Sequence, residues 1–404
     1  MIQKIKMQIN INLILVLTVV FIDLLGVGLI IPILPVLIGK DNINFGLLIA
    51  LYPISQLFGA PVLGYFSDIY GRKKIMILSI AGTILSYLLF IIGIFLNVNI
   101  WILFLSRIVD GFTGGNIFIA HSMIADSSTP QNRAKNLGFI NISLGLGMIL
   151  GPVIGGFLSD VSIFNISPFA IPYIFAALIS LFNLIFIIFY LGETAVISEK
   201  PKKNKLHIFL SFQQIYKAFK IKKLRLLFII SYLSSFSFSL FSTFFPQYLS
   251  INFNFTPKSI GLTTAYIGLW LAIGVIFALP VLNKKLPDSK LMYLSSFGIG
   301  LFLCLTLVPE NPFWLYFILP VIAICMAITA TCVISLLSRI ADNSRQGEIL
   351  GINQSVQAFA TTAPFIGGFL SSYWIKLPFL LAAIATFISF WLVYYKYDLK
   401  MDGE

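Results

Sequence analysis

Charged residues are scarce in this sequence. Lysine, arginine, aspartate and glutamate make up 10% of the 404 residues, whereas a soluble globular protein carries about 25%. Hydrophobic residues make up 58%. A water-soluble fold has no means of burying so much apolar surface, so lipid must be the solvent for most of the chain. The composition therefore excludes an ordinary soluble protein.

Cysteine and histidine are also rare. The three cysteines, Cys304, Cys325 and Cys332, lie in apolar stretches as small packing residues would. The two histidines, His121 and His207, are far apart in sequence. No set of these residues has the spacing of metal ligands, so we expect no metal site.

Catalytic and nucleotide-binding motifs are absent. The sequence has no nucleophile elbow, phosphate loop or dinucleotide fingerprint. We therefore expect neither an enzyme nor an ATP-driven pump, and no cofactor. Strands that alternate with a period of two, as in an outer-membrane barrel, are absent as well.

What the sequence does contain is long apolar runs, each close to the roughly 20 residues that a membrane helix needs. The first run is too long for a cleaved signal peptide and lacks a cleavage site. The pattern predicts twelve spans, at residues 12–38, 44–66, 75–96, 99–124, 136–158, 169–191, 226–249, 259–282, 291–308, 313–337, 348–372 and 377–395.

The basic residues gather on one side of these spans. If the N-terminus is cytoplasmic, Lys40, Lys258 and Lys376 are outside, Arg107 is within a span, and the other 23 of 27 lysines and arginines are inside. This positive-inside pattern predicts a multi-pass protein of the cytoplasmic membrane with both termini in the cytoplasm. It accounts for the net charge of +12 by membrane topology, so we do not expect the protein to bind nucleic acid.

The longest polar segment divides the chain into residues 1–192, a basic linker at 193–224, and residues 225–404. The linker's second part places aromatic side chains near one face and lysines toward the other. This pattern fits a short helix on the inner membrane surface, although a solvated linker is equally consistent. The aromatic residues are Phe209, Phe212, Tyr216 and Phe219.

The two halves repeat each other. GPVIGGFLS at 151–159 recurs as APFIGGFLS at 363–371, and IADSS at 124–128 recurs as IADNS at 340–344. Two parallel halves are what a transporter needs to rock around a central site. We therefore predict an all-α membrane protein with twelve transmembrane helices in two pseudo-symmetric six-helix bundles.

A short charged turn, GYFSDIYGRKK at 64–74, interrupts the apolar runs. Gly71 allows a tight turn, and Arg72 and Lys73 anchor it at an anionic leaflet. Topology signalling alone would explain these cations, but not Asp68 or its spacing from Gly64 and Gly71. We therefore expect a conformational latch, whose contacts form in one conformer and break in another.

Three ionisable residues lie deep in spans, where each costs roughly 2.5–3.5 kcal/mol on insertion scales. They are Asp23, Arg107 and Asp110. Arg107 and Asp110 are three residues apart and share a helix face, as a purely structural pair also would. We expect the two acids to carry the coupling proton, with Arg107 setting their charge balance.

Neutral polar residues follow one face of the seventh and eleventh spans. They either line a water-filled cavity for the substrate or join helices by hydrogen bonds. The residues are Ser231, Ser235, Ser239 and Ser242 in the seventh span, and Asn353, Gln357 and Thr361 in the eleventh.

The turn at 64–74 resembles the signature turn of the major facilitator superfamily at all five positions named above. The fifth span resembles the glycine–proline signature of antiporters in that superfamily, at Gly138, Gly147, Gly151, Pro152, Gly155 and Gly156. Small residues there let helices approach closely, and the proline bends the span. The resemblance implies the superfamily's fold over the whole chain and a fifth helix that seals the pore against leak.

The fourth-span segment from Arg107 to Gly111 also resembles the superfamily, and the first-span segment from Asp23 to Pro35 is similar to the tetracycline-efflux branch of drug/proton antiporters. This similarity is strong over about residues 20–160. It implies a secondary transporter, expected to be a monomer, that exports a small amphiphilic molecule by alternating access and is driven by protons.

The sequence departs from that branch in three respects. Ser86 stands where tetracycline exporters carry an acid, and Asp110 is an acid outside the branch's pattern. The predicted eighth and ninth spans offer only neutral polar residues, Thr263, Thr264, Tyr266 and Trp270. An exporter of an endogenous metabolite or siderophore is therefore the alternative. An importer, a membrane sensor and a membrane enzyme fit the sequence less well.

Overall fold

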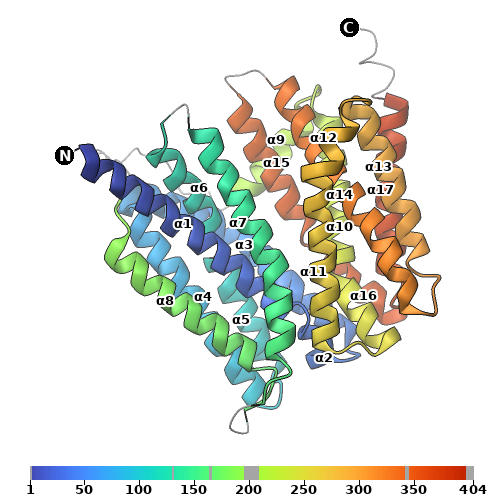
Figure 1. Ribbon diagram of the computed structural model, residues 1–404, viewed down its shortest axis with the longest axis horizontal. Helices are drawn as coiled ribbons and strands as arrows, with labels where there is room; N and C mark the ends of the chain where they lie inside the picture. The colour runs from blue at the N-terminus through green and yellow to red at the C-terminus, as the bar shows by residue number, and fades with distance from the viewer. Residues whose placement is uncertain (1, 130–131, 163–165, 195–208, 342–344, 397–404) are drawn as a thin grey trace. The chain divides into compact units, whose positions relative to one another are not determined.

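The computed structural model describes the chain except for residues 1, 130–131, 163–165, 195–208, 342–344 and 397–404. Every regular element in the described ranges is a helix (Figure 1). The all-α class is therefore confirmed. The middle of the predicted linker, at 195–208, and the end of the IADNS repeat, at 342–344, lie outside the described residues.

The chain forms two compact units. Unit 1 contains Met1–Ile38, Leu51–Leu210 and Thr256–Ala265, and unit 2 contains Gly39–Ala50, Ser211–Phe255 and Tyr266–Glu404. Helices α3 and α11 each have residues in both units. Each unit thus combines three segments that are separated in the sequence.

The helices of the first half overlap the predicted spans, and the first helix begins ten residues before the first predicted span. They are α1 (Ile2–Ile30), α2 (Leu34–Ile38), α3 (Asn42–Tyr70), α4 (Arg72–Phe95), α5 (Ile100–Thr113), α6 (Asn116–Ser127), α7 (Arg133–Leu158) and α8 (Ile171–Tyr190). Figure 1 shows them in blue to green.

The linker contains the short helix α9 (Leu210–Lys220), so its helical interpretation is the one that the structure shows. The other helices are α10 (Arg225–Phe253), α11 (Pro257–Ile273), η1 (Gly274–Ala278), α12 (Leu279–Leu282), α13 (Asp288–Leu305), η2 (Pro312–Trp314), α14 (Leu315–Ile340), α15 (Gln346–Ala360), α16 (Pro364–Tyr373) and α17 (Leu377–Lys396).

Eleven helical segments of the described chain are long and apolar enough to cross a membrane. The predicted span at 348–372 corresponds to α15 and α16, which are separated by a turn at 361–363. Pro364 begins α16 and lacks the N–H that a continuous helix would use there. The eleven candidate segments and this further pair of helices account for the twelve predicted spans.

Two other predicted spans are candidate membrane segments that contain a break. The span at 12–38 turns at 31–33, where Pro32 cannot donate a backbone hydrogen bond. The span at 99–124 is broken between α5 and α6 at Gly114 and Gly115. The turn at Gly114 and Gly115 helps to build the site described below.

Candidate functional site

Three ionisable side chains are buried together in unit 1. Asp23 on α1 is 8% exposed, and Arg107 and Asp110 on α5 are 5% and 3% exposed. Arg107 Nη1 lies 3.4 Å from Asp110 Oδ2, as their shared helix face predicts. Asp23 is close enough to Asp110 for their charges to interact. The structure therefore brings the three predicted proton-coupling residues into one group.

The polar atoms of this group are only partly paired. Asp23 Oδ2 and the Nε and Nη2 atoms of Arg107 have no hydrogen-bond partner among the described residues. A buried polar atom without a partner raises the free energy of the folded state, so such atoms often mark a functional site. Here a carboxyl oxygen can take up a proton, and two guanidinium N–H groups can donate to an acceptor.

Asn116, at the start of α6, completes the group, and sequence reasoning missed it. Its side chain is 1% exposed and interacts with the Asp23 carboxyl group. It points there because the chain turns at Gly114 and Gly115, where Gln56 Nε2 donates a 2.7 Å hydrogen bond to the Gly114 carbonyl oxygen. The adjacent glycines were the sequence signal for this turn.

Aromatic side chains surround the guanidinium group of Arg107. Its Cζ lies 5.1 Å from the ring centre of Phe90, which stacks on Tyr173 at 4.0 Å. A cation over an aromatic face is attracted by the ring quadrupole. Tyr87 fills the space beside Gly26, where a Cβ atom would meet its hydroxyl group. The charged group is thus enclosed by rings from α4 and α8.

Ser86 lies next to Asp110. Ser86 on α4 is close enough to Asp110 on α5 for its side chain to influence that carboxyl group, and its Oγ forms no hydrogen bond with a described residue. The two helices are also joined by the Ser106 hydroxyl group, which donates a 2.8 Å hydrogen bond to the Ser86 carbonyl oxygen. The position that lacks the expected acid therefore borders the position that has an unexpected one.

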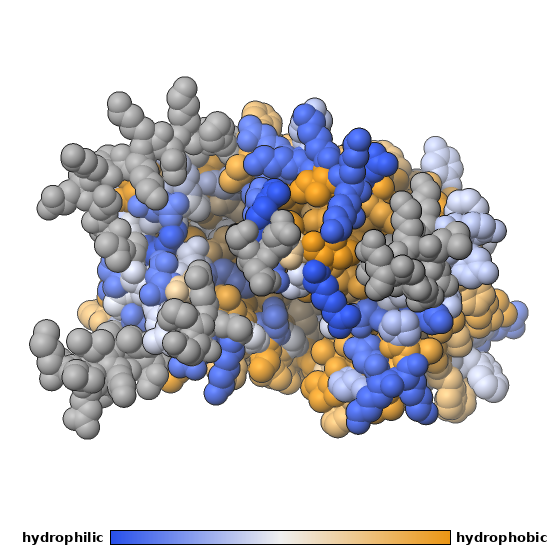
Figure 2. Space-filling view, turned by 90° about the horizontal axis from the view of Figure 1, so that it is seen from above, coloured by the Kyte–Doolittle hydropathy of each residue, from blue (hydrophilic) through white to orange (hydrophobic). Residues whose placement is uncertain are grey.

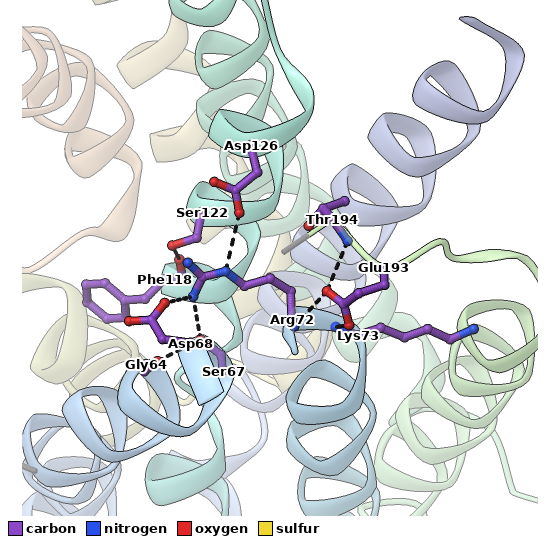
Figure 3. Close-up of polar contacts among 10 residues, drawn as sticks. All are labelled: Gly64, Ser67, Asp68, Arg72, Lys73, Phe118, Ser122, Asp126, Glu193 and Thr194. Atoms are coloured by element: carbon purple, nitrogen blue, oxygen red, sulfur yellow. Dashed lines mark hydrogen bonds and ion pairs between the residues drawn. The ribbon is translucent and has the colours of Figure 1, made fainter. Parts of the chain in front are cut away.

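The predicted latch residues gather around Arg72 (Figure 3). Its Nη1 lies 2.6 Å from Asp68 Oδ1 and donates to Ser67 Oγ at 2.6 Å. Its Nε lies 3.4 Å from Asp126 Oδ2 at the end of α6. Gly71 has a φ of 99°, a conformation that favours glycine. The turn between α3 and α4 is thus tied to α6 as well.

Glu193, just after α8, is a fourth partner of this turn that sequence reasoning missed. Its Oε1 accepts from the Arg72 backbone N–H at 2.9 Å, and its Oε2 accepts from the Lys73 backbone N–H at 3.2 Å (Figure 3). Both are first-turn donors of α4 that have no partner within that helix. The Lys73 ammonium group donates to the Ile188 carbonyl oxygen at 2.8 Å, which also joins α4 to α8.

The antiporter-type glycines of α7 face α1 and the start of α11 within unit 1. A Cβ atom on Gly151 would stand 2.7 Å from Gly28 Cα, and one on Gly155 would meet the Leu29 backbone. A Cβ atom on Gly156 would stand 2.8 Å from the Pro257 carbonyl oxygen. These contacts require glycine because backbone meets backbone.

The remaining signature positions behave differently from one another. A Cβ atom on Gly147 would stand 2.8 Å from the Phe21 carbonyl oxygen of α1, and one on Gly261 of α11 would meet the Pro152 carbonyl oxygen. A Cβ atom on Gly138 or Gly64 would meet nothing within 4 Å. Close approach therefore explains most of the α7 signature. It explains neither Gly138 of α7 nor Gly64 of the turn signature.

The neutral polar residues of unit 2 form bonds between α10 and α15. Gln357 Nε2 donates to Ser231 Oγ at 3.5 Å, and Ser239 Oγ donates to the Thr361 carbonyl oxygen at 3.3 Å. Asn353 is 2% exposed, and its Oδ1 has no partner in the described part of the chain. Two of these polar contacts therefore join the helices, as the interhelical-bond interpretation expects, and Ser235 is partly buried on α10.

Asp288 shows that the second half does contain a buried acid. The predicted ninth span begins at residue 291, whereas α13 begins with Asp288 and leaves it 6% exposed. Its Oδ2 lies 3.3 Å from Arg339 Nη2 and accepts from Ser335 Oγ at 2.8 Å. Asp288 thus joins the start of α13 to the end of α14.

Known proteins of one family are similar to this chain over most of its length. The family model described as Major Facilitator Superfamily matches residues 16–363. Tetracycline resistance protein, class H, from Pasteurella multocida is 29% identical over 395 residues, which are 93% of this chain and 94% of that protein. Multidrug resistance protein 2 from Bacillus subtilis is 26% identical over 395 residues, with 96% of each chain covered. The predicted similarity to tetracycline and multidrug efflux proteins is confirmed.

A solved structure shows the same fold. The nucleoside transporter NupG superposes with a TM-score of 0.74 at 12% identity, over 95% of this chain and 99% of that chain. The twelve-helix architecture predicted from the apolar runs therefore fits, and both fold and relatives are those of multi-pass membrane transporters and not of enzymes. On the strength of the family match over most of its length, this chain belongs to the Major Facilitator Superfamily.

Proposed function

We propose that the protein is a proton-coupled exporter of a small amphiphilic molecule across the cytoplasmic membrane. The observation that carries this proposal is the buried group of Asp23, Arg107 and Asp110, because two acids and one base in an apolar bundle need a reason. Sequence similarity to tetracycline and multidrug resistance proteins supports the direction of transport.

The proposed coupling uses competition for the two carboxyl groups. Arg107 pairs with Asp110 when that carboxyl group is ionised. A proton arriving from outside neutralises Asp110 or Asp23 and frees the guanidinium group, and substrate binding from inside favours release of the proton. Each proton moving inward gains about 2.3 kcal/mol per 100 mV, which can concentrate the substrate outside. No other cofactor is needed.

Asp110 takes the place of the acid that the tetracycline-efflux branch carries in the third span. Ser86 stands at that position in this chain, and its side chain interacts with Asp110. Moving the carboxyl group from α4 to α5 keeps a negative charge beside Arg107. We propose that the coupling chemistry is retained while the shape of the site differs, which would change the substrate.

The cluster around Arg72 acts as the conformational latch of this cycle. Asp68, Asp126 and the carboxylate of Glu193 all bind the same turn in the present conformation. We propose that some of these contacts break when the cavity opens to the other side. In this proposal the turn lies in the cytoplasm with both termini, and one copy of the chain is the working unit.

Inside-out membrane vesicles provide the test. Vesicles energised to an acid interior would receive tetracycline and other amphiphilic drugs one at a time, with a pH-sensitive dye reporting proton efflux. We expect a substrate to release protons from wild-type vesicles but not from Asp23→Asn or Asp110→Asn vesicles. Glu310→Gln is the matched control, because Glu310 is exposed on the loop before η2. Equal proton release by wild type and Asp23→Asn would exclude the mechanism.

An exporter of an endogenous metabolite is the second candidate. It is favoured by Ser86 and by the neutral side chains Thr263, Thr264, Tyr266 and Trp270 on α11, where the tetracycline branch carries polar or ionisable residues. The same vesicle assay with metabolite extracts decides between them. Proton release by an extract fraction, together with silence for every drug, would identify the metabolite exporter.

A further inference from the structure

The short helix α9 of unit 2 presents an exposed face of aromatic and basic side chains. Tyr216 is 62% exposed and Phe219 is 50% exposed. The Lys220 ammonium group lies 4.5 Å from the centre of the Tyr216 ring. Lys217, about one helical turn before Lys220, is exposed as well. This face combines apolar rings with positive charge.

The opposite face of α9 is fixed to unit 2. Ala218 is fully buried in the core cluster that also contains residues of α10 and α14. Gln214 accepts a hydrogen bond from the Ser355 hydroxyl group on α15. The helix therefore has a fixed orientation, so its exposed face is a defined surface and not a solvated linker.

The surface continues into the segment that leads to α10, and it has one sign of charge. Lys222, Lys223 and Arg225 follow the two lysines of the helix and are exposed. No aspartate or glutamate occurs between Glu199 and Asp288. None of the five cations forms an ion pair with another described residue. The positive charge of the surface is therefore uncompensated within the described chain.

This surface lies next to the start of a candidate membrane span in the sequence. Helix α9 ends at Lys220, and the span of α10 begins at Arg225. Five residues reach at most about 17 Å, so the end of α9 lies within that distance of the start of the span. Figure 1 labels α9 near the top, and Figure 2, seen from above, shows hydrophilic side chains mixed with hydrophobic ones on the face that it draws.

We propose that α9 and the following basic segment bind anionic phospholipid headgroups. The lysine ammonium groups meet the headgroup phosphates, and Tyr216 and Phe219 enter the boundary between headgroups and acyl chains. The partner is anionic because the surface has five cations and no acid. The hydrogen bond from Ser355 to Gln214 then makes lipid binding felt by α15, the helix that carries Asn353 and Gln357.

Native mass spectrometry of the full-length protein tests the binding. The protein in a non-ionic detergent would be titrated with dioctanoyl phosphatidylglycerol and, separately, with dioctanoyl phosphatidylcholine. We expect saturable binding of the anionic lipid, and Lys217→Gln with Lys220→Gln should weaken it about tenfold, since each cation near a charged lipid surface contributes to affinity. The zwitterionic lipid should show no such dependence.

The matched control removes the same charge elsewhere. Lys284→Gln with Lys285→Gln neutralises two exposed lysines between α12 and α13, and it should leave the dissociation constant within about twofold of wild type. Equal weakening by the two double variants would overturn the proposal, because any pair of lysines would then suffice. Competition by inorganic phosphate at equal concentration would also overturn it, because the site would then bind free anions.

The link to α15 has its own readout, which does not require transport. Hydrogen exchange of residues 346–360 should slow about threefold when the anionic lipid binds wild type, and less when it binds Gln214→Leu, which keeps all five cations. Equal slowing in both proteins would disprove the link through Gln214. Failure of proton-coupled export would leave both of these measurements unaffected.

Discussion

The carboxylate of Glu193 fills the space beside Gly71 that a Cβ atom would occupy. The same carboxylate accepts hydrogen bonds from the first two backbone N–H groups of α4. A glycine in a left-handed conformation and an acid 122 residues later thus depend on each other. This relationship makes the turn sensitive to a single added methyl group.

We predict that Gly71→Ala destabilises the protein by about 1–3 kcal/mol, because the side chain would be strained at φ 99° and would displace Glu193. Gly64→Ala is the control from the same signature, since its Cβ atom would meet nothing within 4 Å. The midpoint of thermal unfolding in detergent measures both. Equal midpoints for the two variants would show that the Glu193 contact does not matter.

Moving the acid back from α5 to α4 tests the relation between Asp110 and Ser86. We expect Asp110→Asn to abolish substrate-induced proton release and the double variant Ser86→Asp, Asp110→Asn to restore part of it, because the two side chains are adjacent. Thr83→Asp with Asp110→Asn is the control, with a buried acid one turn earlier on α4. If Thr83→Asp rescues as well as Ser86→Asp, position 86 has no special role.

The buried pair of Arg107 and Asp110 should show strong energetic coupling. Arg107→Met leaves the Asp110 carboxyl group without its base, and Asp110→Leu leaves Arg107 without its acid, so each should cost about 3–5 kcal/mol. The double variant should cost much less than the sum. A double-mutant cycle on thermal stability measures this difference, and additive losses would argue that the 3.4 Å contact contributes nothing.

The close contact of α7 with α1 provides another matched pair. Gly155→Ala places a methyl group against the Leu29 backbone, and overpacking of this kind costs about 1–3 kcal/mol. Gly145→Ala, on the same helix, meets nothing within 4 Å. We expect a lower unfolding midpoint for Gly155→Ala only. A proton-leak assay on vesicles would also show whether α7 seals the pore, as the resemblance implies.

The fold could be predicted from the sequence because membrane helices are set by long apolar runs, which are local features. The deep charges were found for the same reason: Asp23, Arg107 and Asp110 each stand out within a run. The breaks at Pro32, at Gly114 with Gly115, and before Pro364 were missed. In each case the composition stays apolar through the break, and only backbone chemistry changes.

The partners supplied by distant segments could not be predicted. Asn116 interacts with Asp23, and Glu193 binds the turn at Gly71. The sequence positions of Asn116 and Glu193 do not indicate these partners. Asp288 was overlooked because the predicted ninth span began three residues later. Such contacts depend on how helices pack, which a single sequence does not reveal.

The tie between Asp288 and Arg339 has a consequence for how the chain assembles. In the first half the base Arg72 starts α4, the third span, and pairs with the acid Asp126 at the end of α6, in the fourth span. In the second half the signs are exchanged, because the acid starts α13 and the base lies at the end of α14. A third helix inserted beside the wrong repeat would therefore bring Arg72 to Arg339, or Asp288 to Asp126. Like charges repel, so the reversed polarity disfavours pairing between a helix of one half and the corresponding neighbour from the other half.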